Sequence, residues 1–475
     1  MAVIFGVFDP SADSRAAIRS ALPPTLTGLN GLERKSVTHG ACEIYWEAPQ
    51  STPISFSTDR SEARDRFAFV CGDFKRPYSR NSNAAVRLLS DIPADDGDYR
   101  GVSGQDGFYL ACVFDADRKI LALGVDTLGH FPLYYWQSGD VFLFGTSPSL
   151  FKAHPTFCPK VSEYALVSIL MLNFTAGGHS IFKDVRRNAP GHLVQYSQGN
   201  RVREIEANRL QFSDERFDRP YPSVRDEVLQ IMDNFHAPLS AEPKLDLLLS
   251  GGQDSRLIAG FIAKHSRREA IRCVSIGNRH DQELNYAHQA AGTLGFQHRF
   301  SDADSKNATI YAFNQLRLES LQGPFTSFEN GTTQFLLSEQ QGTPAVSGYV
   351  GDAVIGDRHI MTAIDPRRGE FSLSELVKNI RRYGYEDSDV LALLGGTKKH
   401  VIDEINSDLH KEWSSINAEN FQRAWYFVLT NRQRFHVGSV SWRLTLGNWQ
   451  LLPYLNRNLL ECIASVPLNY LLTFP

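Results

Sequence analysis

The stretch "LLLSGGQDSRLIAG", residues 247–260, decides the fold, because an apolar run breaks at two glycines and then resumes with helical spacing. Extended at both ends it reads "KLDLLLS" and then "SRLIAGFIAKH", which are typical of a buried strand followed by a helix. Residues 250–255 then form the turn at the carboxyl end of the strand. In open parallel sheets this is the edge at which ligands bind.

The residue types in this turn suit a phosphorylated ligand. Gly251 and Gly252 let the backbone approach a ligand closely, and the hydroxyls of Ser250 and Ser255 join the free N–H groups of the helix start. Asp254 among these anion-binding groups indicates a divalent cation between its carboxylate and the phosphates. No Gly-Lys-Ser/Thr follows the glycines, so the turn is not a Walker A loop. The alternative is an ordinary turn in which Asp254 or Ser255 caps the helix.

The rest of the chain divides into two domains. After the turn, "AIRCVSIG" and "QELNYAHQAAGTLG" repeat the strand and helix, which predicts a parallel α/β sheet, and residues 371–437 are mostly helical. Residues 1–205 contain short β-rich runs separated by Asp, Gly and Ser. Residues 206–225 are polar, include two prolines and fit neither period, so we interpret them as a linker before the second domain, residues 226–475.

The composition is that of an ordinary folded protein of 475 residues, 42% of them hydrophobic, with a formal net charge of -4. This balance argues against a nucleic-acid-binding surface. The N-terminus lacks the features of a signal peptide, and no segment reaches the roughly 18 apolar residues of a membrane helix. The six cysteines show no CxxC spacing and are expected to be reduced thiols packed in the core. We therefore expect a cytoplasmic protein without nucleic-acid or membrane partners.

The motif "SGGQDS" at residues 250–255 resembles the pyrophosphate-binding PP-loop, SGGxDS, of enzymes that cleave ATP to AMP and pyrophosphate. The whole chain resembles the class B asparagine synthetase family, in which a glutaminase-like domain precedes an ATP-using synthetase domain. That family also includes β-lactam-forming synthetases and lasso-peptide cyclases. Matching stretches in family order are "IFGVFDP", "DTLGHFPLYYW", "SIFKDVRRNAPGHLV", "SGYVGDAVIGD" and "LLPYLNRNLLECIASVP".

The resemblance implies both a fold and a reaction. The fold is α/β: an Ntn-type αββα sandwich, then a PP-loop (adenine nucleotide α-hydrolase-like) parallel α/β domain with a helical C-terminal part. The reaction uses ATP and Mg²⁺ to adenylate a carboxylate, and an amine or ammonia then attacks the acyl-adenylate to give an amide. An intramolecular version, forming a β-lactam or closing a lasso peptide, is the alternative. The partners are small-molecule or peptide carboxylate and amine substrates, and a homodimer stays open.

The resemblance also assigns site residues. Asp254 and Asp352 would ligate magnesium, and two carboxylates sharing Mg²⁺ with phosphates would neutralise the leaving pyrophosphate. The residues that would bind ATP are Leu248, Ser250, Gly251, Gly252, Asp254, Ser255, Ile276 and Gly348.

The first domain departs from the family at its start. Ala2 follows the initiator methionine where the resemblance requires a nucleophilic cysteine, and Val3 stands where a glycine is usual. A methyl group cannot attack an amide, so we expect no glutamine hydrolysis and interpret the domain as a retained scaffold. Cys71 lies within a predicted strand, without a terminal amine, and is not expected to substitute.

The second loop departs as well. Asparagine synthetases carry "SGEGSDE", whereas this chain has "SGYVGDA", with Tyr349 in place of the catalytic glutamate and Ala353 after Asp352. A tyrosine here resembles the β-lactam-forming members, in which a downstream glutamate orients it and it helps to deprotonate the amine. Glu386 is the candidate partner. A surface role for Glu386 and a pocket-lining role for Tyr349 are the alternatives.

The family also has a basic stretch beyond "PLNYLLTFP", residues 467–475, whose lysine would stabilise charge on the phosphates. Three expectations follow from its absence in this sequence: the sequence is truncated before the stretch, Arg443 supplies the cation, or adenylation is lost. In the third case the protein is a catalytically inactive, nucleotide-binding scaffold subunit.

Overall fold

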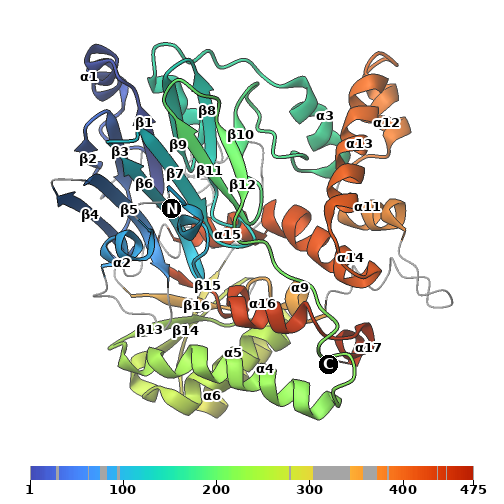
Figure 1. Ribbon diagram of the computed structural model, residues 1–475. Coiled ribbons are helices and arrows are strands. Elements are labelled where there is room, and N and C mark those ends of the chain that lie inside the picture. The colour runs from blue at the N-terminus through green and yellow to red at the C-terminus, as the bar shows by residue number, and fades with distance from the viewer. Residues whose placement is uncertain are drawn as a thin grey trace.

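The computed structural model has two parts, a β-rich domain and a parallel sheet flanked by helices (Figure 1). It describes residues 2–27, 32–61, 64–74, 83–93, 97–277, 280–302, 343–356, 372–381, 384–435, 437–445 and 447–473.

The β-rich domain consists of two six-stranded sheets in which all neighbouring strands pair antiparallel. The first has the order β10-β8-β9-β1-β3-β2 and the second β12-β11-β7-β6-β5-β4. Strands of the first sheet are β1 (Val3–Phe8), β2 (Lys35–His39), β3 (Cys42–Glu47), β8 (Tyr134–Ser138), β9 (Val141–Gly145) and β10 (Arg186–Arg187). Strands of the second are β4 (Ile54–Ser61), β5 (Arg64–Phe74), β6 (Gly107–Asp115), β7 (Ile120–Val125), β11 (His192–Ser197) and β12 (Arg203–Glu206).

Aromatic side chains join the two sheets face to face. Phe8 of the first sheet contacts Phe114 and Tyr196 of the second, with ring centroids 5.7 and 5.4 Å apart. Phe142 stacks on Tyr196 at 4.8 Å. Alternate residues of each strand therefore form one shared core between the sheets.

Helices complete this domain. Helix α2 (Ala84–Asp91) buries Leu88 and Leu89 in a second apolar cluster with strands of the second sheet, so it covers the outer face of that sheet. The other two helices are α1 (Ala12–Ala21) and α3 (Glu163–Leu172). The expected αββα sandwich is thereby confirmed.

The second part contains a five-stranded parallel sheet with the order β15-β14-β13-β16-β17. Its strands are β13 (Leu245–Leu248), β14 (Ile271–Gly277), β15 (Gln297–Asp302), β16 (Ala345–Ser347) and β17 (Gln450–Leu451). Helices α4 (Tyr221–His236), α5 (Gln253–His265) and α6 (Gln282–Leu294) lie together on one side of it (Figure 1). The predicted alternation of strand and helix from residue 244 is confirmed.

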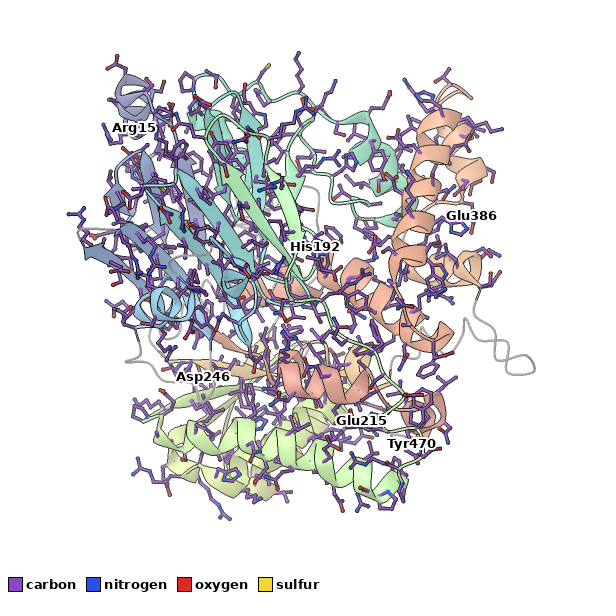
Figure 2. The ribbon with its side chains drawn as sticks, viewed as in Figure 1. Arg15, His192, Glu215, Asp246, Glu386 and Tyr470 are labelled. Carbon is purple, nitrogen blue, oxygen red and sulfur yellow. The ribbon has the colours of Figure 1, made fainter. Side chains whose placement is uncertain are left out.

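A buried carboxylate links the strands at the start of this sheet. Asp246 of β13 accepts hydrogen bonds from Arg272 of β14 at 2.8 and 2.6 Å and from Asn448 before β17 at 2.9 Å (Figure 2). Because both guanidinium nitrogens bind one planar carboxylate, the pair also fixes the register of neighbouring strands.

The C-terminal part is helical, as predicted. Helices α11, α12 and α13 pack against α3 of the β-rich domain, and a π-helix at 429–433 continues α14. The helices are α9 (Gly351–Gly356), α11 (Leu373–Arg381), α12 (Asp387–Leu393), α13 (Lys399–Ser415), α14 (Asn420–Val428), α15 (Val437–Leu444), α16 (Arg457–Ile463) and α17 (Leu468–Thr473).

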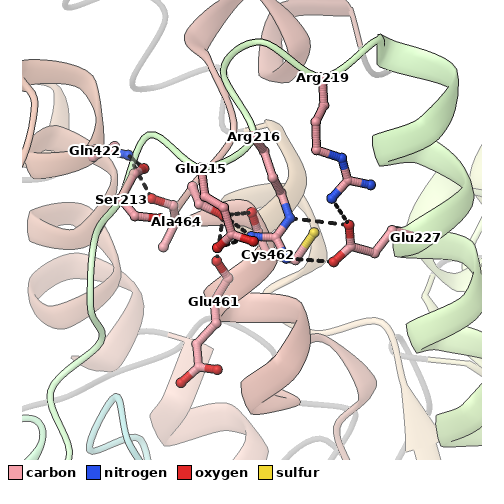
Figure 3. Close-up of polar contacts among 10 residues, drawn as sticks. Ser213, Glu215, Arg216, Arg219, Glu227, Gln422, Glu461, Cys462 and Ala464 are labelled. Atoms are coloured by element: carbon pink, nitrogen blue, oxygen red, sulfur yellow. Dashed lines mark hydrogen bonds and ion pairs between the residues drawn. The ribbon is translucent and has the colours of Figure 1, made fainter.

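The connection between the domains is held by polar contacts (Figure 3). Strand β12 ends at Glu206 and α4 begins at Tyr221, so the last part of the predicted linker is helical. Arg216 donates to Glu227 of α4 at 2.6 Å and to Ser465 after α16 at 2.6 Å. The connection is thus attached to both ends of the second domain.

The cysteines are reduced thiols, but not all of them are buried. All six cysteines are free, and five are buried; Cys158 is exposed, which corrects the expectation that all pack in the core. Cys158 follows the buried Phe157 in a loop, where its side chain faces solvent.

Within the described residues, no helix combines the length and apolarity needed to cross a membrane.

Candidate functional site

The strand order places a topological switch point between β13 and β16. From β13 the chain runs to β14 and β15 on one side, and it later returns to β16 on the other side of β13. Loops after these two strands therefore diverge and leave a crevice at their carboxyl ends, where open α/β sheets bind ligands. The two loops are residues 249–252 and 348–350, which contain or adjoin most of the predicted site residues.

Serine hydroxyls organise the first loop. Ser255 accepts a hydrogen bond from the N–H of Ser250 at 3.1 Å and donates to the carbonyl of Ser250 at the same distance. The N–H of Gly252 donates to the hydroxyl of Ser250 at 3.1 Å. These contacts curl the loop over the start of α5, which concentrates N–H groups and hydroxyls at the positive end of the helix.

The N-cap of α5 is Gly252, so the alternative in which Asp254 or Ser255 caps the helix is wrong. Within the described part of the chain, no side chain accepts a hydrogen bond as the cap of this helix. Its first N–H groups are therefore available to an anion.

Glycines allow the close approach of three segments. A Cβ at Gly251 would lie 2.6 Å from the backbone oxygen of Glu283 in α6. A Cβ at Gly351 would lie 2.7 Å from the carboxyl carbon of Asp254, and one at Gly348 would lie 3.1 Å from the nitrogen of Ser255. A residue with a side chain at Gly251 would push the first loop away from α6, and one at Gly348 or Gly351 would push the second loop away from the start of α5.

Two carboxylates meet at the crevice. The N–H of Asp352, in the first turn of α9, donates to the carboxylate of Asp254 in the first turn of α5. Burial, with the negative charge of Asp352, raises the pKa of Asp254 to about 6. The hydroxyl of Tyr454 donates to the backbone oxygen of Asp254 at 3.2 Å. Two neighbouring acidic groups beside an anion-binding helix start fit a divalent cation that phosphate oxygens also coordinate.

No cluster of three or more candidate metal ligands occurs among the residues that the structure describes. A cation at Asp254 and Asp352 would therefore take its remaining ligands from water and phosphate, which is the usual arrangement for Mg²⁺.

The second loop holds a strained residue. Val350 has a φ of 71°, in the left-handed region that a β-branched residue rarely adopts. Such a conformation costs on the order of 1–3 kcal/mol and persists only where surrounding structure enforces it, often at functional sites. The strain lies between Tyr349 and Gly351, at the crevice.

An apolar wall adjoins the crevice. Leu248, Ile276 and Tyr349 all pack against one small cluster of Val274, Val440 and Leu444. The structure thus brings together Leu248 and Ile276, two of the residues assigned to ATP binding, and the tyrosine of the second loop. Val440 and Leu444 belong to α15, and sequence reasoning missed them because they lie more than 150 residues from the motif.

Glu386 lies elsewhere. It is the N-cap residue of α12, its carboxylate accepts a hydrogen bond from Arg381 at 3.0 Å, and its side chain is 60% exposed. Figure 2 shows it among α11 to α13, far from the parallel sheet. The structure does not bring Glu386 and Tyr349 together.

The start of the β-rich domain is closed. Ala2 is 0% exposed, its N–H donates to the hydroxyl of Thr445 at 2.9 Å, and its carbonyl accepts from the indole of Trp442 at 2.9 Å. Burial raises the pKa of the Cys71 thiol. Arg443, the proposed replacement cation, is 2% exposed on α15.

Known proteins resemble both parts of the chain. A family model for a glutamine amidotransferase domain matches residues 93–205, and one for asparagine synthase matches residues 232–473, just over half of the chain. Asparagine synthetase [glutamine-hydrolyzing] 2 of Bacillus subtilis (strain 168) is 23% identical over 201 residues, which are 40% of this chain. The match spans only about a quarter, 27%, of that relative's length.

Similar solved structures include two enzymes. One is the glutamine phosphoribosylpyrophosphate amidotransferase of B. subtilis complexed with ADP and GMP, at 10% identity and a TM-score of 0.30, covering 82% of this chain and 94% of that chain. The other is an NH3-dependent NAD synthetase of Campylobacter jejuni, at 14% identity and a TM-score of 0.21, covering 40% of this chain and 94% of that chain. From the family model that matches residues 232–473, the chain belongs to the asparagine synthase family.

Proposed function

We propose that this protein is an ATP-dependent amide-bond-forming ligase that adenylates a carboxylate and releases pyrophosphate. Membership of the asparagine synthase family supports ATP-dependent ligation. The observation that carries the finer proposal is the meeting of the Ser250–Ser255 turn with Asp352 at the switch point of the parallel sheet.

ATP would bind along the crevice from the turn to the apolar wall. Its phosphates would accept hydrogen bonds from the first N–H groups of α5 and from the hydroxyls of Ser250 and Ser255. Leu248 and Ile276 would flank the adenine, because they line the apolar cluster beside the turn. Gly348 lets the second loop lie against the backbone of Ser255, beside the proposed phosphate site.

Asp254 and Asp352 would hold Mg²⁺. When bound, the ion supplies positive charge that stabilises the leaving pyrophosphate. The chain's own part is to keep Asp254 in position: the N–H of Asp352 bonds to its carboxylate and the Tyr454 hydroxyl bonds to its backbone oxygen. This orientation is present before any ligand arrives, so little reorganisation is needed on binding.

In the proposed reaction an oxygen of the substrate carboxylate attacks the α-phosphorus of ATP, and the bond to the pyrophosphate oxygen breaks. An amine nitrogen then attacks the acyl carbon, AMP leaves, and the amine gives up a proton. Tyr349, in the loop after β16, is the candidate that receives or relays this proton. Glu386 is not placed to orient it, so any orienting group must be another residue.

The nitrogen source is proposed to be ammonia or the amine substrate itself. Ala2 offers no nucleophile, and its backbone groups bond to Thr445 and Trp442. An intramolecular reaction that forms a β-lactam or a cyclised peptide is the second candidate. The packing of Tyr349 beside Leu248 and Ile276 favours it, because it places the tyrosine next to the proposed nucleotide.

The test is magnesium-dependent release of pyrophosphate from ATP by the full chain. Carboxylic acids would be screened with ammonia, simple amines or glutamine as the nitrogen source, alongside substrates that carry both groups. We expect release that depends on one acid and that glutamine alone does not support as a nitrogen source. A substrate with both groups that reacts without added amine would favour the intramolecular reaction.

Two variants serve as controls. Asp254→Ala should abolish release, while Asp389→Ala, which removes an exposed carboxylate from the first turn of α12, should leave it unchanged. ATP binding without pyrophosphate release across the whole panel would refute the ligase and favour an inactive scaffold.

A further inference from the structure

A large cavity with several charged residues in its lining lies between the β-rich domain and helices α13 and α14. Its volume is about 650 Å³, within the range of small-molecule sites. It is bordered by β10 and β12, the edge strands of the two antiparallel sheets. None of its lining residues belongs to the loops at the switch point, so the cavity is separate from the proposed ATP site.

One wall of the cavity is acidic. Glu404, Asp408 and Glu412 recur every four residues along α13 and therefore lie on one face of that helix. Asp408 accepts a hydrogen bond from Tyr164 at 3.0 Å and pairs with Lys411 of its own helix at 3.0 Å. Asp408 is thus held between Tyr164 of α3 and Lys411 of its own helix.

The opposite wall is mainly basic. It contains Arg186 of β10, His192 of β11 and Arg209 after β12 (His192 in Figure 2). It also holds one carboxylate, Glu204 of β12, which accepts a hydrogen bond from the N–H of Ala189 at 3.0 Å. Arg209 pairs with Glu206 at 3.4 Å and donates to the hydroxyl of Ser415 at 3.3 Å. His192 contacts the backbone oxygen of Pro190 at 2.8 Å through Nδ1, which leaves Nε2 as its second polar atom.

The two walls meet at the hydrogen bond from Arg209 to Ser415 of α13, but in the part of the chain that the structure describes their charges are not paired with each other. Among the described residues, no ion pair connects Glu404, Asp408 or Glu412 with a basic residue across the cavity. Opposite charges held apart across a cavity gain little from each other directly, but a ligand that carries both charges would pair with each wall.

A π-helix shapes the floor. The segment Leu429–Gln433 interrupts the regular spacing after α14. The side chain of Asn431 donates to Oε1 of Glu412 at 2.7 Å. The hydroxyl of Thr430 donates to the carbonyl of Tyr426 at 2.9 Å and lies 3.5 Å from the same Oε1. Among the described residues, the other oxygen, Oε2, has no hydrogen-bond partner. π-Helical turns are frequent at functional sites, and this one orients a carboxylate toward the cavity.

We propose that this cavity binds a small zwitterion, an amino acid or dipeptide, with its ammonium group toward Glu404, Asp408 and Glu412 and its carboxylate toward Arg186, His192 and Arg209. The inference goes beyond the ligase and does not depend on it. It requires neither ATP nor magnesium.

The test is titration calorimetry on the full chain at low ionic strength, without nucleotide. The probes are the twenty common amino acids and alanyl-alanine, each beside its N-acetyl and C-amide derivatives. We expect at least one probe to bind, and each blocked derivative of it to bind about tenfold more weakly, the size of one charge-assisted hydrogen bond.

Variants locate the site. Glu412→Gln and Arg186→Gln should each weaken binding by about tenfold. Glu404→Gln, at the exposed rim, provides the same test if Glu412→Gln does not fold. Matched controls are Asp403→Asn and Arg203→Gln, which neutralise exposed charges on the same helix and on β12 outside the cavity.

The outcomes separate the two proposals. Asp254→Ala should bind the zwitterion normally even though it loses pyrophosphate release. Failure of every probe to bind more tightly than its blocked derivatives overturns the inference. So does binding that is equal in the wall variants and in their controls.

Discussion

Two places in this chain differ in whether their backbone polar groups are satisfied: the switch point of the parallel sheet and the start of β1. At the switch point, N–H groups at the start of α5 are uncapped within the described residues, and the carboxylate of Asp254 accepts the N–H of Asp352 and lies within reach of its negative charge. At the start of β1, both backbone groups of Ala2 are bonded and its methyl group is buried. Uncapped N–H groups are what the proposed ligand site would need, whereas the backbone groups of Ala2 are already satisfied by the protein itself.

The largest effect is expected from removing either carboxylate at the switch point. Asp254→Asn or Asp352→Asn should reduce magnesium-dependent pyrophosphate release by about 100-fold or more, because each removes one protein charge from the cation site. Rates measured over a range of Mg²⁺ concentrations would check this. A variant that kept the rate and magnesium dependence of the wild type would remove these residues from the metal site.

Two glycines with different surroundings, one crowded and one open, test whether close packing at the first loop matters. Gly251→Ala would place a Cβ 2.6 Å from the backbone oxygen of Glu283, so we expect a loss of about 1–3 kcal/mol in unfolding free energy and weaker ATP binding. Gly260→Ala, inside the following helix α5 and facing open space, should instead stabilise by about 0.5–1 kcal/mol. Urea titrations of the two variants would give both values. Equal effects would show that the close approach to Glu283 is unimportant.

The pH dependence of stability tests the carboxylate pair in a second way. The pKa of Asp254, about 6 in the folded chain, lies above its ordinary value, so its ionisation destabilises the fold as pH rises through 6. Mg²⁺ should offset this, and it should raise Tm more at pH 7.5 than at pH 5. Thermal unfolding with Mg²⁺ or with Na⁺ at equal ionic strength would measure it. In Asp352→Asn the difference between the two pH values should shrink; an unchanged difference would count against the pair.

The smallest effect is expected at the closed centre. Ala2→Cys should restore no glutamine hydrolysis, because the added sulfur enters a buried position that substrate does not reach. Glutamate release from glutamine would check this, with Thr445→Ala, which lacks the hydroxyl that binds Ala2, as a companion. Hydrolysis by the cysteine variant would show that the centre is open.

Local patterns sufficed to predict the turn but not its surroundings. The apolar run, the two glycines and the helical spacing around Ser250 are contiguous, so strand, turn and helix could be predicted from sequence. The approach of Gly251 to Glu283 and the cluster at Val440 depend on packing between segments distant in the chain. No local pattern encodes such contacts.

The same limit explains what sequence reasoning missed at Ala2 and Tyr349. The loss of the nucleophile could be read from one residue, but its closure by Thr445 and Trp442 joins residues more than 400 apart. Glu386 was chosen by its position along the chain, and the structure pairs it with Arg381 instead. Position in sequence does not fix position at a site.

The most direct test of the central claim is hydrogen exchange on the full chain with and without ATP and Mg²⁺. We predict that ATP with Mg²⁺ slows exchange in peptides covering residues 249–257 and 347–353, and leaves residues 2–8 unchanged. Asp254→Asn should lose that protection. Protection at residues 2–8, or none at the two loops although ATP binds, would contradict the assignment of the switch point as the nucleotide site.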